Sequence, residues 1–156
     1  MPRLTAYRKQ VQDAPVQNQA VSTLVVARYR DGRLVKGISM DVDPTKPMCH
    51  VRAPDGVVTE IKLVDLKALF FVKTLEGNSA HNEGLAVDQG DRRSHGSTAI
   101  AIKFEDNEHL VGFTNRYPPN RPFFFVVPAD TKSNNIRILV NKAAVVSMDV
   151  AALPQE

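Results

Sequence analysis

Residues 22–30 have the pattern of a β-strand, in which one face carries Val25, Ala27 and Tyr29 and the other carries Leu24, Val26, Arg28 and Arg30. The next dipeptide, Asp31-Gly32, is typical of a two-residue hairpin turn, because glycine accepts the positive φ that such a turn requires. Residues 33–41 are therefore predicted to form the returning strand, and Gly37 within them indicates a bend or bulge in the sheet.

Further short apolar runs follow this hairpin, separated by segments rich in proline, aspartate and glycine. One helical turn is expected at residues 64–66. Short strands at this spacing, with a bend in the second, are typical of a small β-barrel. The remaining strands of this unit are predicted at residues 48–52, 57–63 and 67–73.

The same pattern returns 75 residues later, and the two stretches align without a gap. Gly37 aligns with Gly112 and Pro44 with Pro119, so turns, bends and apolar positions match rather than nucleophiles or metal ligands. The sequence therefore predicts an all-β protein of two tandem five-stranded Sm/SH3-like small barrels. The second set of strands is predicted at residues 99–105, 108–116, 123–127, 136–140 and 143–150.

Each predicted barrel has only about fifty residues, and a domain of that size buries little surface, so the two are expected to pack together or against another chain. Phe123, Phe124 and Phe125 concentrate apolar area in the second unit, on alternating faces. One of these faces needs cover beyond a single small core, which makes the three phenylalanines a candidate interaction surface. The predicted parts are a polar N-terminal tail (1–20), the first barrel (21–73), a linker (74–98), the second barrel (99–150) and a C-terminal tail (151–156).

The composition argues against several classes of protein, among them nucleic-acid binders and membrane-spanning proteins. The net charge is +3, and charges of both signs alternate instead of forming the basic stripe of a nucleic-acid binder. Cys49 is the only cysteine, so an intrachain disulfide cannot form. No stretch approaches the length of a membrane helix, and the first residues lack the apolar core of a secretory signal. A cytoplasmic protein is expected.

The first hairpin resembles the first signature of Sm-like proteins, with a weaker copy over residues 99–150. This resemblance implies the small-barrel fold. It does not carry RNA binding, because Pro47 and Pro122 stand where RNA-binding members have an asparagine, and the Arg-Gly pair of the base slot is absent. The residues that carry the resemblance are Val26, Tyr29, Asp31, Gly32, Arg33, Val35 and Gly37, followed by Val42 and Asp43.

The chain is also similar to uncharacterised bacterial proteins whose hallmark looks like residues 124–130 together with Ser133-Asn134-Asn135. Some of those relatives carry the repeat beside a PilZ domain, a receptor module for cyclic-di-GMP. By this analogy alone, a nucleotide second messenger is an alternative ligand.

Four cationic residues are candidates for contact with a phosphate or an acidic partner. Arg92 and Arg93 lie on a glycine-bearing part of the linker, where paired arginines can grip phosphate through bidentate hydrogen bonds. Lys46 and Arg121 lie in matched proline-flanked loops, which serve either as rigid turns or as a binding rim.

The sequence contains none of the common nucleotide-binding, hydrolase or zinc motifs, and its histidines are interpreted as surface residues. No catalytic residue, metal ligand or cofactor is predicted. The function that the sequence favours is a non-catalytic protein-binding or assembly module of the bacterial cytoplasm. It would bind a protein partner or further copies of itself, through edge strands or through Phe123–Phe125. The alternative is a nucleotide or nucleic-acid binder.

Overall fold

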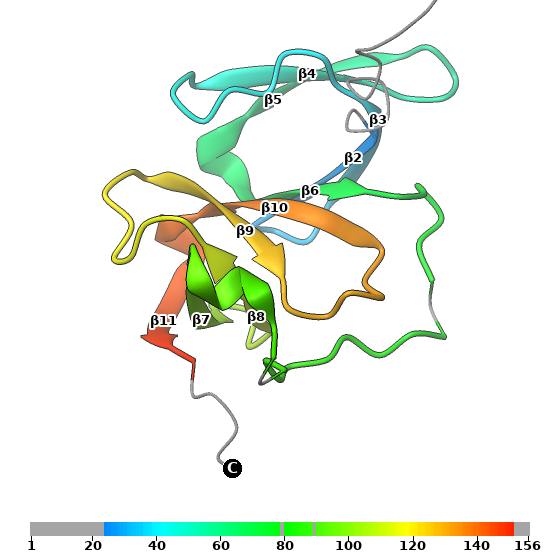
Figure 1. The fold of residues 1–156 in the computed structure, drawn as a ribbon. Helices are drawn as coiled ribbons and strands as arrows, with labels where there is room; N and C mark the ends of the chain where they lie inside the picture. Colours follow the sequence, from blue (N-terminus) through cyan, green and yellow to red (C-terminus); the bar gives the residue numbers. More distant parts are fainter. Residues whose placement is uncertain (1–23, 79, 89, 152–156) are drawn as a thin grey trace, which may run out of the picture.

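The computed structural model describes residues 24–78, 80–88 and 90–151, which form an all-β structure (Figure 1). Ten antiparallel strands make one continuous sheet in the order β11-β7-β8-β9-β10-β6-β2-β3-β4-β5. Predicted tail residues 1–20 and 152–156 lie outside the described part. The strands are β2 (Leu24–Tyr29), β3 (Leu34–Ile38), β4 (Met48–Arg52), β5 (Val58–Lys62), β6 (Leu66–Val72), β7 (Thr98–Phe104), β8 (His109–Thr114), β9 (Phe123–Pro128), β10 (Asn135–Asn141) and β11 (Val145–Val150).

All ten strands that the sequence predicts are present, and local turn chemistry explains where they end. Gly32 has a φ of +97°, and the Asp31 carboxylate accepts a hydrogen bond from the Arg33 amide at 3.0 Å. Asn107 holds the matching turn of the second hairpin with a φ of +72°. The predicted helical turn before β6 is the 3-10 helix η1 (Leu63–Asp65); two more are η2 (Arg92–His95) and η3 (Lys142–Ala144).

The predicted bend at Gly37 is confirmed and has a steric cause. A Cβ atom on Gly37 would lie 2.1 Å from the carbonyl oxygen of Arg52, and one on Gly112 would lie 2.4 Å from that of Val127. Both glycines therefore allow a neighbouring backbone to approach closely. The β3–β4 ladder has a single residue pair, Ile38 with Arg52, where the sheet turns sharply.

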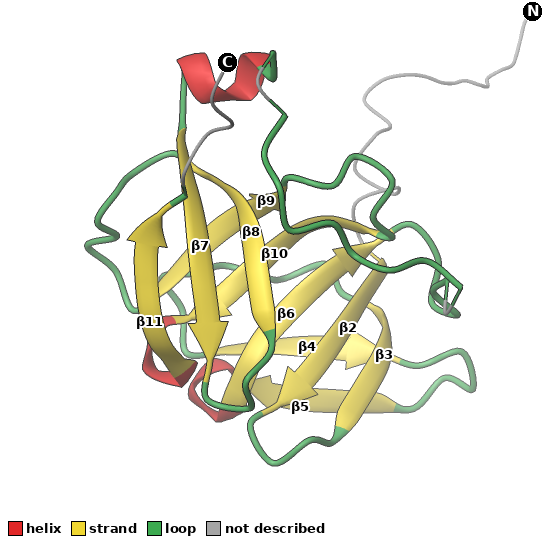
Figure 2. Cartoon of the chain, turned by 90° about the horizontal axis from the view of Figure 1, so that it is seen from below, coloured by secondary structure: helices red, strands yellow, loops and turns green. Residues whose placement is uncertain are grey.

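The two tandem five-stranded barrels that the sequence predicts are not confirmed, because all ten strands belong to one continuous and open sheet (Figure 2). We call β2–β6 the first half and β7–β11 the second half. β6 pairs with β10, which joins the halves edge to edge. An isolated five-stranded unit would leave these edges exposed, and pairing them satisfies their backbone hydrogen bonds. The halves therefore pack together, as their small size predicts.

The joined strands form a wall shared by two hydrophobic cores. On β6, Leu69 and Phe71 belong to the core of the first half, whereas Ala68 belongs to the core of the second half. On β10, Leu139 faces the first core and Val140 the second. This follows from the alternation of side chains along a strand. Both strands therefore carry apolar residues on both faces, since each face packs against one of the cores.

The strand order is the same in both halves, β6-β2-β3-β4-β5 and β11-β7-β8-β9-β10. The gapless alignment at 75 residues holds only as far as the third strand. Cys49 pairs with Ile61, 12 positions on, whereas Phe124 pairs with Val140, 16 positions on. The second hairpin is thus longer by 16 − 12 = 4 residues, and beyond it equivalent positions differ by 75 + 4 = 79.

Candidate functional site

A pocket of about 250 Å³ lies where the loop after β3 meets the loop between β8 and β9. We call it the proline-loop pocket, because Pro44 of the first half and Pro119 of the second both line it. Arg116 and Arg121 also line it. Arg121, the candidate cation of the loop between β8 and β9, therefore lines the same pocket as Pro44 of the matching loop in the first half. Exposed Lys46 lies two residues beyond Pro44.

The three predicted phenylalanines also line the proline-loop pocket, but two of them are largely used inside the protein. Phe123 is 9% exposed and packs in the core of the first half, and Phe124 is 8% exposed in that of the second. Phe125 is half-buried beside Phe71, with 6.1 Å between the ring centroids. The apolar surface of these three phenylalanines was expected to pack against a partner, but it packs mainly against the first half of the same chain.

Arg92 and Arg93 lie on η2, next to β7, and not at the proline-loop pocket. The Arg93 guanidinium donates to Asp91 and to the carbonyl oxygens of Pro128 and Ala129, at 2.8 and 3.0 Å for the two carbonyls. It also lies 4.5 Å from the ring centroid of Phe113. Arg93 therefore fastens the linker to the end of β9, while Arg92 is exposed.

The two end strands of the sheet form the next candidate site, because each has one strand neighbour within the described ranges. On β5, Val58 is 57% exposed; on β11, Val146 and Val150 are 63% and 60% exposed. Unpaired strand edges with exposed apolar side chains are open to pairing with another strand.

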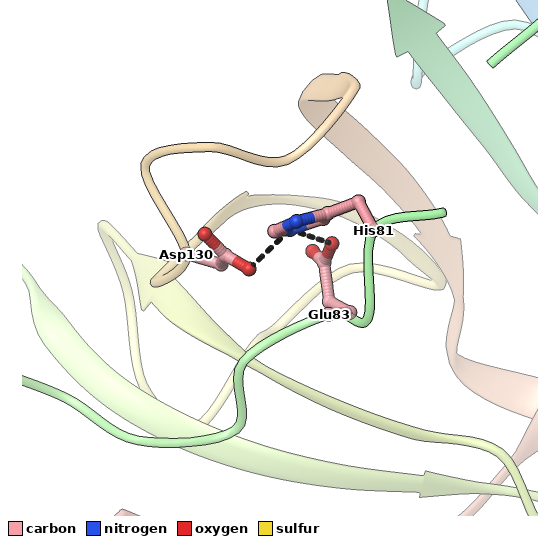
Figure 3. A group of neighbouring side chains, drawn as sticks. All are labelled: His81, Glu83 and Asp130. Carbon is pink, nitrogen blue, oxygen red and sulfur yellow. Dashed lines mark hydrogen bonds and ion pairs between the residues drawn. The ribbon is translucent and has the colours of Figure 1, made fainter. Parts of the chain in front are cut away.

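A cluster of His81, Glu83 and Asp130 lies where the linker crosses the loop between β9 and β10 (Figure 3). The Nε2 atom of His81 lies 2.7 Å from Oδ2 of Asp130 and 3.9 Å from Oε1 of Glu83. Asp130 accepts hydrogen bonds from the amides of Gly84 and Lys132, and the first of these contributes most to lowering the pKa of its carboxyl. Burial raises the pKa of Glu83.

Sequence reasoning treats His81 as an ordinary linker histidine and does not find this cluster. The His-x-Glu spacing of His81 and Glu83 is a weak local signal. Asp130 follows β9 and lies 49 residues away in sequence, so only the fold shows that it meets them.

A model of a protein family matches residues 21–152, and that family is described as a family of unknown function (DUF6982). No curated protein and no solved structure matches the chain. Within the ranges that the structure describes, none of the helices is of a length and apolarity that would allow it to cross a membrane.

Proposed function

The chain belongs to DUF6982, a family of unknown function, and from its geometry we propose a non-catalytic assembly module in which copies join head to tail through β5 and β11. The observation that carries this proposal is the β6–β10 ladder. The first half already binds the second half by pairing two strand edges, and the corresponding edges at the ends of the sheet have the same places in the strand order.

Each half is a small barrel of the Sm/SH3-like kind in this proposal, used twice in tandem. The identical strand order supports it. In that order β6 corresponds to β11 and β10 corresponds to β5, so the two end strands of the described sheet present one edge of each type. Two different edges of one chain make a heterologous contact, which gives a ring if the rotation closes and a filament if it does not.

The internal ladder also specifies the register of the proposed contact. Phe71 pairs with Arg137 and Phe70 with Ile138 inside the chain. Applying the offset of 79 residues to both strands places Val150 opposite Val58 of the next copy. Both valines are more than half exposed, so pairing them would remove apolar surface from water.

Intermolecular disulfide formation tests this register directly. Directly opposed strand residues have Cα atoms within disulfide range. We expect Val58→Cys mixed with Val150→Cys to give a cross-linked dimer under mild oxidation. The control is Val64→Cys mixed with Val150→Cys, since Val64 is 59% exposed but lies on η1. Cys49 adds little background, because its side chain is buried and burial raises its pKa to about 11.

Mass in solution provides the second test. We expect the wild-type chain to associate with increasing concentration at both low and high salt, because backbone pairing and apolar contact do not depend on charge. Val58→Lys combined with Val150→Lys places like charges opposite each other and should give a monomer, whereas Val58→Lys with Val150→Glu should restore association. A wild-type chain that stays monomeric at a concentration of about 100 micromolar contradicts the proposal.

A second candidate function is nucleotide binding, and the proline-loop pocket is the observation that favours it. Arg116 and Arg121 lie there beside aromatic side chains, a combination that suits a phosphate and a base. Titration with cyclic-di-GMP and with an RNA oligomer at two salt concentrations tests it. Binding should weaken steeply as the salt concentration rises. It should also be weaker in Arg121→Ala than in the wild-type chain, and unchanged in Arg92→Ala. Failure of both ligands to bind removes this candidate.

A further inference from the structure

We propose that His81, Glu83 and Asp130 form a binding site for a divalent transition-metal ion of the zinc class. Each residue offers one ligand atom, and the three atoms lie within 4.8 Å of one another (Figure 3). Ligands around tetrahedral zinc lie about 3.3 Å apart, given bonds of about 2.0 Å. The distances from His81 Nε2, 2.7 and 3.9 Å, lie on either side of that value.

Hydrogen bonds from outside the cluster hold the two carboxylates in place. The backbone amides of Gly84 and Lys132 donate to different oxygens of Asp130, at 2.8 and 2.9 Å. Ser133, which is 1% exposed, hydrogen-bonds to Glu83 and accepts from the Asn135 amide. Outer partners of this kind orient metal ligands and are a regular part of metal sites.

The charges in the cluster also favour a cation. Two carboxyl groups face one imidazole, so acidic groups outnumber basic groups among these three side chains, in a region that is partly shielded from water. The Asp130 side chain is 12% exposed and the His81 side chain 23%. A divalent ion would balance both carboxylates and would use the neutral imidazole as a nitrogen ligand.

The donor set selects among metals. One nitrogen and two carboxylate oxygens suit zinc and its neighbours in the first transition row better than calcium or magnesium, which prefer oxygen ligands alone. Three protein ligands leave at least one position for water. A bound ion would tie the linker to the loop between β9 and β10, beside the small cluster in which Val87 is buried.

Metal titration of the full chain, without an affinity tag, tests the site. We expect one Co²⁺ to bind per chain, with visible absorption typical of nitrogen and oxygen ligation, and Zn²⁺ to displace it. Glu83→Gln keeps the size and hydrogen-bonding capacity of the side chain, and His81→Asn removes the nitrogen ligand. Each should weaken binding at least tenfold.

His109→Asn is the matched control, because His109 is exposed on β8 and lies outside the cluster. It should bind Co²⁺ as the wild-type chain does. Zn²⁺ should also raise the unfolding temperature of the wild-type chain but not that of folded Glu83→Gln. A wild-type chain that binds no Co²⁺ or Zn²⁺ overturns the proposal, as does equal binding by Glu83→Gln and wild type; His81 and Asp130 would then serve only as a hydrogen-bonded tether.

Discussion

Two glycines set the curvature of the sheet, one in the second strand of each half. At Gly37 and Gly112 the carbonyl of a neighbouring strand occupies the space in which any other residue would place its Cβ atom. The nearest atom at each position is a backbone carbonyl oxygen, which cannot move aside as a flexible side chain can. The requirement for glycine at these positions is therefore steric.

Gly112→Ala should lower the free energy of unfolding by about 2 kcal/mol or more, because the added carbon would lie 2.4 Å from the Val127 carbonyl oxygen. Gly90→Ala is the control, since nothing lies within 4 Å of the added atom there. Urea unfolding of both variants measures the difference. Equal stability of the two would show that the β8–β9 crossing relaxes without strain.

Individual residues also show where sequence-based prediction of sites ends. Arg93 is a residue type that often contacts phosphate, yet in the fold its guanidinium donates hydrogen bonds to Asp91 and to two backbone carbonyl groups. Arg121 lies in a pocket as a candidate binding residue should. The residue types are the same, and the difference lies in neighbours that are distant in sequence.

The strand β6 carries a buried charge across the boundary between the two halves. The Lys67 side chain is 3% exposed, and its ammonium group pairs with Asp106, at 2.8 Å, and with Glu108 of the turn between β7 and β8. It also lies 4.7 Å from the ring centroid of Phe104. Both acidic partners are about half exposed, so the lysine bears most of the desolvation in this network.

This asymmetry predicts unequal effects of removing each side of the ion pair. Asp106→Asn with Glu108→Gln leaves a buried ammonium group without a counter-charge and should reduce stability by about 3 kcal/mol. Lys67→Met removes the buried charge, keeps an apolar stem and leaves two solvated carboxylates, so its effect should be smaller. Chemical denaturation gives the ranking, and a larger loss in Lys67→Met would contradict this account.

The whole molecule is expected to unfold as one unit, because the halves share the β6–β10 wall and each core contains residues from both halves. Phe123 of the second half lies in the first core, and Ala68 of the first half lies in the second. Neither core is complete without the other half.

Matched core truncations test this cooperativity. Ile61 and Val140 are both 0% exposed, one in each core. Ile61→Ala should lower stability by about 2–5 kcal/mol and Val140→Ala by somewhat less, and each should move a single transition of the whole chain. Calorimetry and far-ultraviolet circular dichroism would detect a second transition, which would mean that the halves unfold independently.

The sequence alone determined the features that depend on near neighbours: alternating strands, the Asp31-Gly32 turn and the bend at Gly37. These follow from backbone geometry within a few residues. Only the tertiary structure decided that the two halves are joined through β6 and β10, because strand edges pair through backbone groups common to all sequences. The sheet also brings distant loops together. The contact of Asp130 with His81 and the hydrogen bonds from Arg93 to carbonyl groups near the end of β9 both depend on this arrangement, so no local pattern could predict them.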